Sequence, residues 1–133
     1  MINHASGTFE VKVTPETDGN GGEPALGRMS LDKQFHGDLE GTSKGEMLTV
    51  GTDVKGSAGY VAMERVIGKL KGQSGTFALQ HTGTMTRGVP NLTITVVPDS
   101  ATGELIGLAG KMKINITDAR HFYEFEYTLA DSQ

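Results

Sequence analysis

The chain has 133 residues, a formal net charge of −4 and no cysteine. Its length suits a single domain, residues 1–133, and the lack of cysteine excludes disulfides and thiolate metal sites. The acidic balance and the scattered lysines exclude the basic footprint of a nucleic-acid-binding protein, so we expect no nucleic-acid partner.

The N-terminal stretch MINHASGTFEVKV lacks a basic region followed by an apolar run, and no segment approaches the length of a membrane span. We therefore expect a cytoplasmic protein without a membrane partner. Glycine is frequent, at 19 residues, but the glycines lie between alternating segments, where they indicate turns and bulges.

Alternation of apolar and polar residues predicts about eight antiparallel strands. In chain order they cover residues 6–14, 28–35, 38–50, 58–70, 75–83, 91–97, 108–117 and 121–129. A polar, glycine-rich loop at 17–24 separates the first two. No segment has a sustained helical period. Residues 60–70 come nearest, but their β-branched side chains and the turn signal KGQSG favour a strand.

Eight short strands with one apolar face close into a barrel or stack as a sandwich. A barrel of this size has an interior just wide enough for side chains or one small ligand. The last strand lines that interior with aromatic rings, including Tyr123, Phe125 and Tyr127. Such a lining suits either a packed core or a ligand pocket.

The stretch GTFALQHTG places His81 on the same face as Phe77 and Leu79, so His81 should point inward, where an imidazole needs a partner. The length of the KGQS turn decides which partner it meets. A two- or four-residue turn puts Glu64 opposite or diagonal to His81, whereas a three-residue turn brings Met63 and Arg65 to that face. Glycine at position 72 favours the two-residue hairpin.

An inward Glu64–His81 pair has two interpretations. It could be an acid/base pair that transfers protons or closes a ring on a bound apolar substrate. It could equally be a buried, hydrogen-bonded pair with no substrate.

We expect the ligand-binding lining to include Tyr60, Phe77, Tyr123 and Tyr127. Glu40 lies between glycines that permit a bulge, which could turn it toward the cavity, although a solvated strand position is the alternative. The histidines lack short ligand spacing and Met112 interrupts the phosphate-loop pattern after Gly110-Lys111, so we expect neither metal nor cofactor.

Both faces of the predicted strand at 58–70 are apolar. Tyr60, Ala62 and Val66 share one face, and Val61, Met63 and Ile67 share the other. A strand that is buried on both faces indicates a second subunit or a covering segment, so we expect a homo-oligomer.

A family resemblance rests on Thr102-Gly103, Gly107 and Gly110, which form a TGxxxGxxG element, and on the closing run HFY at 121–123. Through these residues the stretch from 59 to 129 resembles the allene oxide cyclase-like, calycin-type barrel family, above all its uncharacterised bacterial members. The resemblance implies an eight-stranded antiparallel barrel, a homo-oligomer, and a cavity that in the plant enzymes takes an unstable fatty-acid epoxide.

The same resemblance places His81 where the plant cyclases have a lumen tyrosine, and Glu10 where they have a cavity glutamate. Lys12 stands where they have an asparagine, so the plant reaction is not carried over to this chain.

These observations together predict an all-β, eight-stranded antiparallel barrel that binds a small apolar or amphipathic molecule in its lumen. If it is an enzyme, we expect a cofactor-independent isomerase or cyclase that uses His81 and Glu64. The alternative is a non-catalytic ligand-binding or structural barrel whose interior is filled by side chains.

Overall fold

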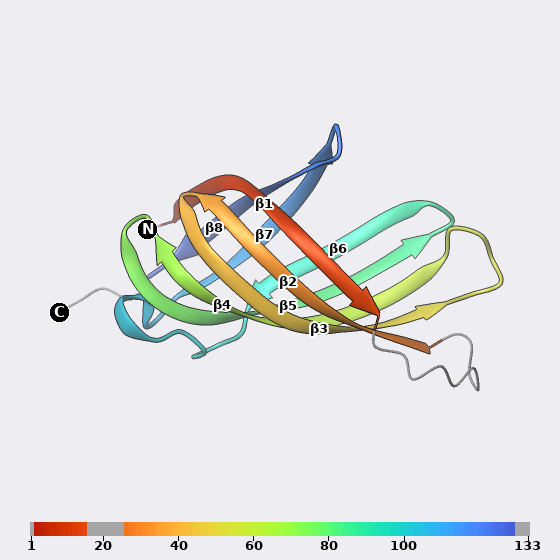
Figure 1. Cartoon of the computed structure of the whole chain (residues 1–133), viewed down its shortest axis with the longest axis horizontal. Coiled ribbons are helices and arrows are strands. Elements are labelled where there is room, and N and C mark those ends of the chain that lie inside the picture. The colour runs from red at the N-terminus through yellow and green to blue at the C-terminus, as the bar shows by residue number, and fades with distance from the viewer. Residues whose placement is uncertain (1, 16–25, 130–133) are drawn as a thin grey trace.

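A computed structural model describes residues 2–15 and 26–129, and the predicted loop at 17–24 lies outside them. The chain forms a closed antiparallel barrel in which each strand pairs with the next and β8 pairs with β1 (Figure 1). This confirms the predicted fold class. The strands are β1 (Asn3–Pro15), β2 (Leu26–Gly37), β3 (Leu39–Gly51), β4 (Ala58–Leu70), β5 (Gln73–Thr86), β6 (Val89–Val96), β7 (Ala109–Thr117) and β8 (Arg120–Thr128).

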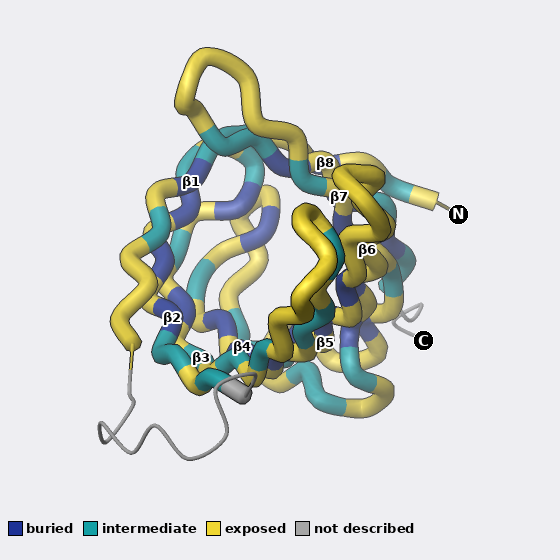
Figure 2. The backbone as a smooth tube through the Cα atoms, turned by 90° about the vertical axis from the view of Figure 1, so that its right-hand side faces the viewer, coloured by how far each residue is buried: buried dark blue, intermediate teal, exposed yellow. Residues whose placement is uncertain are grey.

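The strands follow the period of two in the sequence. In β4, the buried residues Ala62, Glu64 and Val66 alternate with the exposed residues Val61 and Met63. The same alternation of buried and exposed positions is visible along the backbone in Figure 2. One face of each strand therefore points into the barrel and the other forms its outer wall.

A two-residue turn at Lys71-Gly72 fixes the register of β4 against β5. Both residues have positive φ, 48° and 87°, as a type I′ turn requires, and glycine adopts this conformation without steric cost. The turn pairs His81 with Ala62 and Glu64 with Leu79. Glu64 is therefore diagonal to His81 on the inner face, which confirms the two-residue alternative.

One end of the barrel is closed by a packed core. Tyr123 helps to hold it, because its hydroxyl accepts a hydrogen bond from the Leu39 N–H at 2.8 Å and donates to the His36 carbonyl at 2.9 Å. These bonds tie β8 to the turn between β2 and β3. The fully buried apolar side chains of this core include Phe35, Leu39, Val66, Leu70, Phe77, Leu79 and Phe125.

The connection from β6 to β7 plugs this closed end. It contains the 3₁₀ turn η1 (Gly103–Leu105), and it buries Leu105 and Leu108 in the core. Its backbone covers an edge of β5 that β6 leaves free, since Thr102 N–H donates to the Thr76 carbonyl at 2.8 Å. The glycine-rich element at 102–110 therefore builds a plug before the chain enters β7.

The other end of the barrel splays open. Strands β6 and β7 pair at two positions, Ile94 with Met112 and Thr95 with Lys111, and the pairing of β1 with β8 stops at Phe9. The tip of the β7–β8 hairpin consequently stands away from β6 (Figure 1). Among the described residues, no helix is long and apolar enough to cross a lipid bilayer.

Candidate functional site

A buried polar network lies across the middle of the barrel interior, with Glu64 at its centre. The Glu64 Oε1 atom accepts hydrogen bonds from Lys33 Nζ at 2.8 Å and from His81 Nε2 at 2.5 Å. The other oxygen, Oε2, accepts a hydrogen bond from Ser43 Oγ at 2.5 Å. Four strands, β2 to β5, each contribute one of these side chains. All four residues are buried, and the Glu64 side chain has no exposed surface.

The surroundings of Glu64 keep its carboxyl group ionised. Burial on its own raises the pKa of Glu64, because it penalises the charged form. The hydrogen bond from His81, the positive charge and hydrogen bond of Lys33, and the hydrogen bond from Ser43 outweigh burial and lower the pKa to about 2. Glu64 is therefore an anion at neutral pH, and it only accepts hydrogen bonds.

The ionised carboxylate fixes which nitrogen of His81 carries a proton. Since Glu64 cannot donate, the bond between Glu64 and His81 requires a proton on Nε2. In the neutral imidazole, Nδ1 then keeps a free lone pair. Within residues 2–15 and 26–129, His81 hydrogen-bonds through Nε2 alone, and no fully buried side-chain nitrogen lacks a partner. The Nδ1 atom is therefore not sealed from solvent.

Tyr60 lies beside His81 toward the open end. The two ring centroids are 6.3 Å apart, and Tyr60 is half-buried. Burial raises the pKa of Tyr60, and the negative charge of Glu64 raises it further, so its hydroxyl remains a proton donor. Gly83 makes this arrangement possible, because even a Cβ atom at that position would collide with the Tyr60 ring.

The sequence prediction missed two members of the network, Lys33 and Ser43. The signal was present, since Lys33 shares the face of Leu31 and Phe35, and Ser43 shares the face of Leu39. A lysine in a strand is normally solvated, but here the Lys33 Nζ atom lies 5.1 Å from the Phe9 ring centroid and 5.8 Å from that of Phe35. These cation–π contacts and the bond to Glu64 compensate for its loss of water.

Three predicted lining residues belong to the packed core instead of the open half. Phe77 and Tyr127 are buried, and each ring stacks on the Phe125 ring. The Tyr123 hydroxyl is occupied by backbone groups, as described above. Of the predicted aromatic lining, Tyr60 is the residue that the structure brings close to His81 and Glu64.

Glu40 and Glu10, two carboxylates that the sequence analysis links to the cavity, lie on the outer wall. Glu40 is exposed and pairs in regular register with Lys69, so no bulge turns it inward, which corrects that expectation. Glu10 is 71% exposed and forms an ion pair with His36 at 2.9 Å. The position that the family resemblance assigned to a cavity glutamate is therefore outside the barrel.

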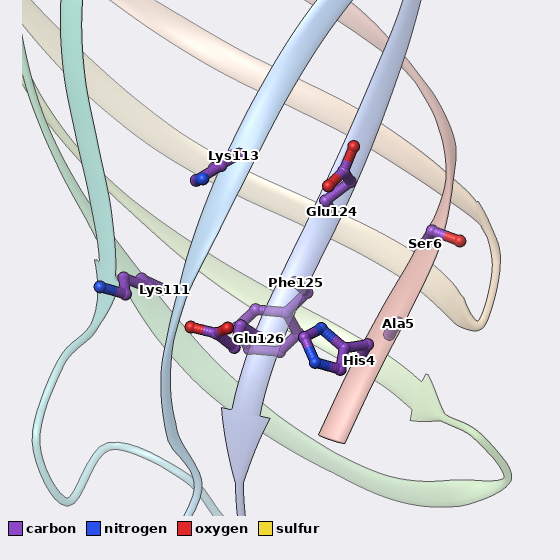
Figure 3. A pocket seen from close by; sticks show the side chains of 8 residues that line it. All are labelled: His4, Ala5, Ser6, Lys111, Lys113, Glu124, Phe125 and Glu126. Atoms are coloured by element: carbon purple, nitrogen blue, oxygen red, sulfur yellow. The ribbon is translucent and has the colours of Figure 1, made fainter. Parts of the chain in front are cut away.

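A separate hollow of about 460 Å³ lies on the outer wall over β1, β7 and β8 (Figure 3). Charges of opposite sign face one another across it. Lys111 pairs in register with Glu126, which pairs with His4, and Lys113 pairs with Glu124. Such alternation leaves no concentrated charge of one sign, so this hollow has no evident preference for a charged ligand.

Comparison with known proteins places this barrel in a family. The model of a family described as "Protein of unknown function (DUF3224)" matches residues 5–127. The chain belongs to the DUF3224 family. A crystal structure of a DUF3224 protein of unknown function from Shewanella oneidensis MR-1 has 51% sequence identity and a TM-score of 0.92, and the match covers 99% of this chain and 100% of that one. No curated protein matches.

These comparisons identify the DUF3224 family and give no evidence for the allene oxide cyclase-like family that the sequence resembles. The closed eight-stranded barrel agrees with the fold which that resemblance implied. Membership in a family of unknown function assigns no chemistry, so the function of this DUF3224 barrel depends on what its own site can do.

Proposed function

We propose that this barrel binds a small amphipathic molecule in its open half, with a polar group on His81 and an apolar part against the mouth. The observation that carries the proposal is the orientation of His81 by ionised Glu64, which leaves the Nδ1 lone pair without a protein hydrogen bond within residues 2–15 and 26–129. Between His81 and the open end of the barrel, inward-facing apolar side chains are partly exposed, as a binding surface without its ligand would be. They are Val13, Met85 and Leu92.

The same groups support a cofactor-independent proton transfer, in the manner of an isomerase or cyclase. His81 Nδ1 would accept a proton from the bound molecule, and Glu64 would stabilise the imidazolium that forms. The Tyr60 hydroxyl would donate a hydrogen bond to the oxygen on which negative charge develops. His81 would then return the proton to a different atom of the same molecule, so that the reaction has no net proton change.

Native mass spectrometry of the protein purified from its own cells tests the binding step. We expect a retained small molecule in the wild type, and weaker retention in His81→Phe and in Glu64→Gln. His36→Phe is the matched control, because His36 also pairs with a glutamate but lies on the outer wall. If His81→Phe retained the small molecule as well as His36→Phe does, the lumen site would be refuted.

Transfer of deuterium from heavy water into the retained molecule tests the chemistry. A base at His81 predicts exchange by the wild type and none by His81→Gln, whose amide can still bond Glu64 but cannot accept a proton in this pH range. Retention without exchange would support the second candidate, a non-catalytic binder. Loss of folding in both His81 variants would support a structural pair, which agrees with the tight packing of the closed half.

A further inference from the structure

On the outer wall of the barrel, an apolar cluster on β3 and β4 adjoins an uncharged polar area on β5 and β6, and we name the two together the β3–β6 face. Its apolar part comprises Leu48 and Val50 on β3 and Val61 and Met63 on β4, all 45–54% exposed. Leu48 and Val61 are direct cross-strand partners, so these side chains are contiguous. A hollow of about 620 Å³ lies over them, extends to Gln80 on β5, and is bordered on the β2 side by the ion pair of Arg28 and Glu46.

The β5 and β6 part of the β3–β6 face is polar but uncharged. The fourteen residues of β5 and the eight residues of β6 contain no aspartate, glutamate, lysine or arginine, in a chain that is 21% charged overall. Most of the outward-facing residues here carry hydroxyl or amide groups, which both donate and accept hydrogen bonds. They include Thr76, Gln80, Thr82, Thr84, Asn91, Thr93 and Thr95.

From these features we infer that the β3–β6 face binds a second copy of this chain in a two-fold symmetric dimer. In such a contact each residue near the axis meets its own copy, so any charge there would meet a like charge. Threonine, glutamine and asparagine can bond to themselves, whereas lysine and glutamate cannot. By contrast, the wall formed by β1, β7 and β8 alternates lysine and glutamate, and it has no comparable uncharged area.

The size of the face sets the strength of this dimer. Strand spacing of about 4.8 Å and a rise of about 3.4 Å per residue make the face roughly 20 Å wide and 25 Å long. That area is smaller than the roughly 800 Å² that each partner buries in a standard stable interface. The dimer is therefore reversible and dissociates on dilution.

Sedimentation equilibrium over a dilution series tests the inference. We expect a concentration-dependent dimer in the wild type, and a dissociation constant at least about tenfold higher in Val61→Lys and in Met63→Glu, because each variant places like charges in the contact. Ile116→Lys is the matched control: Ile116 is more exposed, at 62%, but lies at the barrel mouth, so this variant should dimerise like the wild type.

A mixture of Val61→Lys and Val61→Glu adds a test of symmetry. If residue 61 meets its own copy, the two variants form a heterodimer although neither self-associates. Circular dichroism and thermal unfolding check that each variant is folded. Thr82→Lys, at the β5 position directly across from Val61, replaces any variant that does not fold. A wild type that is monomeric throughout the dilution series, or a dimer that survives Val61→Lys and Met63→Glu, would overturn the inference.

Discussion

The two halves of the barrel interior follow the same sequence pattern but have different exposure. In the closed half, Phe77 and Leu79 are fully buried, and the plug at Leu105 covers them. In the open half, Met85 continues the inward face of the same strand yet is 41% exposed, and Ile116 is 62% exposed. Alternation therefore determines which face of a strand points inward. Whether that face is packed depends on how far the neighbouring strands remain paired.

The polar network lies at the boundary between these halves. Phe77 and Val66 lie on its closed side, and Tyr60 lies toward the mouth. A charged pair costs less at this depth than in the centre of a dry core, because water or a ligand can reach one side of it. The boundary position therefore explains how the same barrel interior can hold both an ion pair and a packed core.

The largest effect should come from the closed half. Phe77→Ala removes a ring with 0% exposure that is stacked on Phe125, and it should reduce the free energy of unfolding by about 3–5 kcal/mol. Urea denaturation measures the change. Phe122→Ala, on the outer face of β8 and only half-buried, is the control and should cost clearly less. Equal costs for the two variants would remove the distinction between packed interior and outer wall.

Next in size is the effect of breaking the network at the boundary. Lys33→Met leaves the Glu64 carboxylate without its buried counter-charge and should cost about 3–5 kcal/mol. Adding Glu64→Gln removes that charge, so the double variant should be more stable than the sum of the single changes predicts, by about 1–3 kcal/mol. Simple additivity in this double-mutant cycle would show that the pair is not coupled.

Acid should lower the free energy of unfolding by weakening the network at the boundary, and the effect should be similar to or smaller than that of Lys33→Met. The folded-state pKa of Glu64, about 2, lies below the ordinary value of 4.5, so the ionised form favours the folded state. This contribution is fully present above about pH 4.5 and is lost as the pH falls toward about 2, and it amounts to about 3 kcal/mol.

Urea unfolding at several pH values compares the wild type with Glu64→Gln, which should lack this part of the acid dependence. Glu10→Gln provides the control, because its ion pair with His36 is exposed and contributes little. Identical acid profiles for the wild type and Glu64→Gln would mean that the Glu64 pKa is not lowered by folding.

The smallest effect should come from the open half. Ile116→Ser and Leu92→Ser change side chains that are already 62% and 40% exposed, and they should alter stability by less than about 0.5 kcal/mol. If this half binds a ligand, both variants should nevertheless weaken its retention in native mass spectrometry. A large loss of stability would instead indicate that the mouth is packed, and the contrast between the halves would disappear.

The fold and the register of the site could be predicted from the sequence because both depend on local signals. Alternation identified the strands, and glycine at 72 selected the turn that places Glu64 beside His81. Lys33 was missed because its partners come from other strands, and a lysine is assigned to solvent unless a counter-charge is known. The assignment of Glu40 to the cavity failed because glycines permit a bulge without requiring one.

The plug and the splayed end could not be predicted, because they depend on long-range pairing. Nothing local in the sequence of β6 indicates that it pairs with β7 at two positions, or that the 100–108 segment takes over the edge of β5. The exposure of Ile116 follows from that short pairing and not from its own residue type.

The closure of the barrel through β1 and β8 also has a consequence for biosynthesis. It pairs Asn3 with Tyr127, so the barrel cannot close until β8 has left the ribosome. At a synthesis rate of about 5–20 residues per second, β1 has one unpaired edge for several seconds. Beyond Phe9, β8 leaves this edge unpaired in the closed barrel too, and Glu10 and Lys12 are the charged positions there that discourage pairing with another chain.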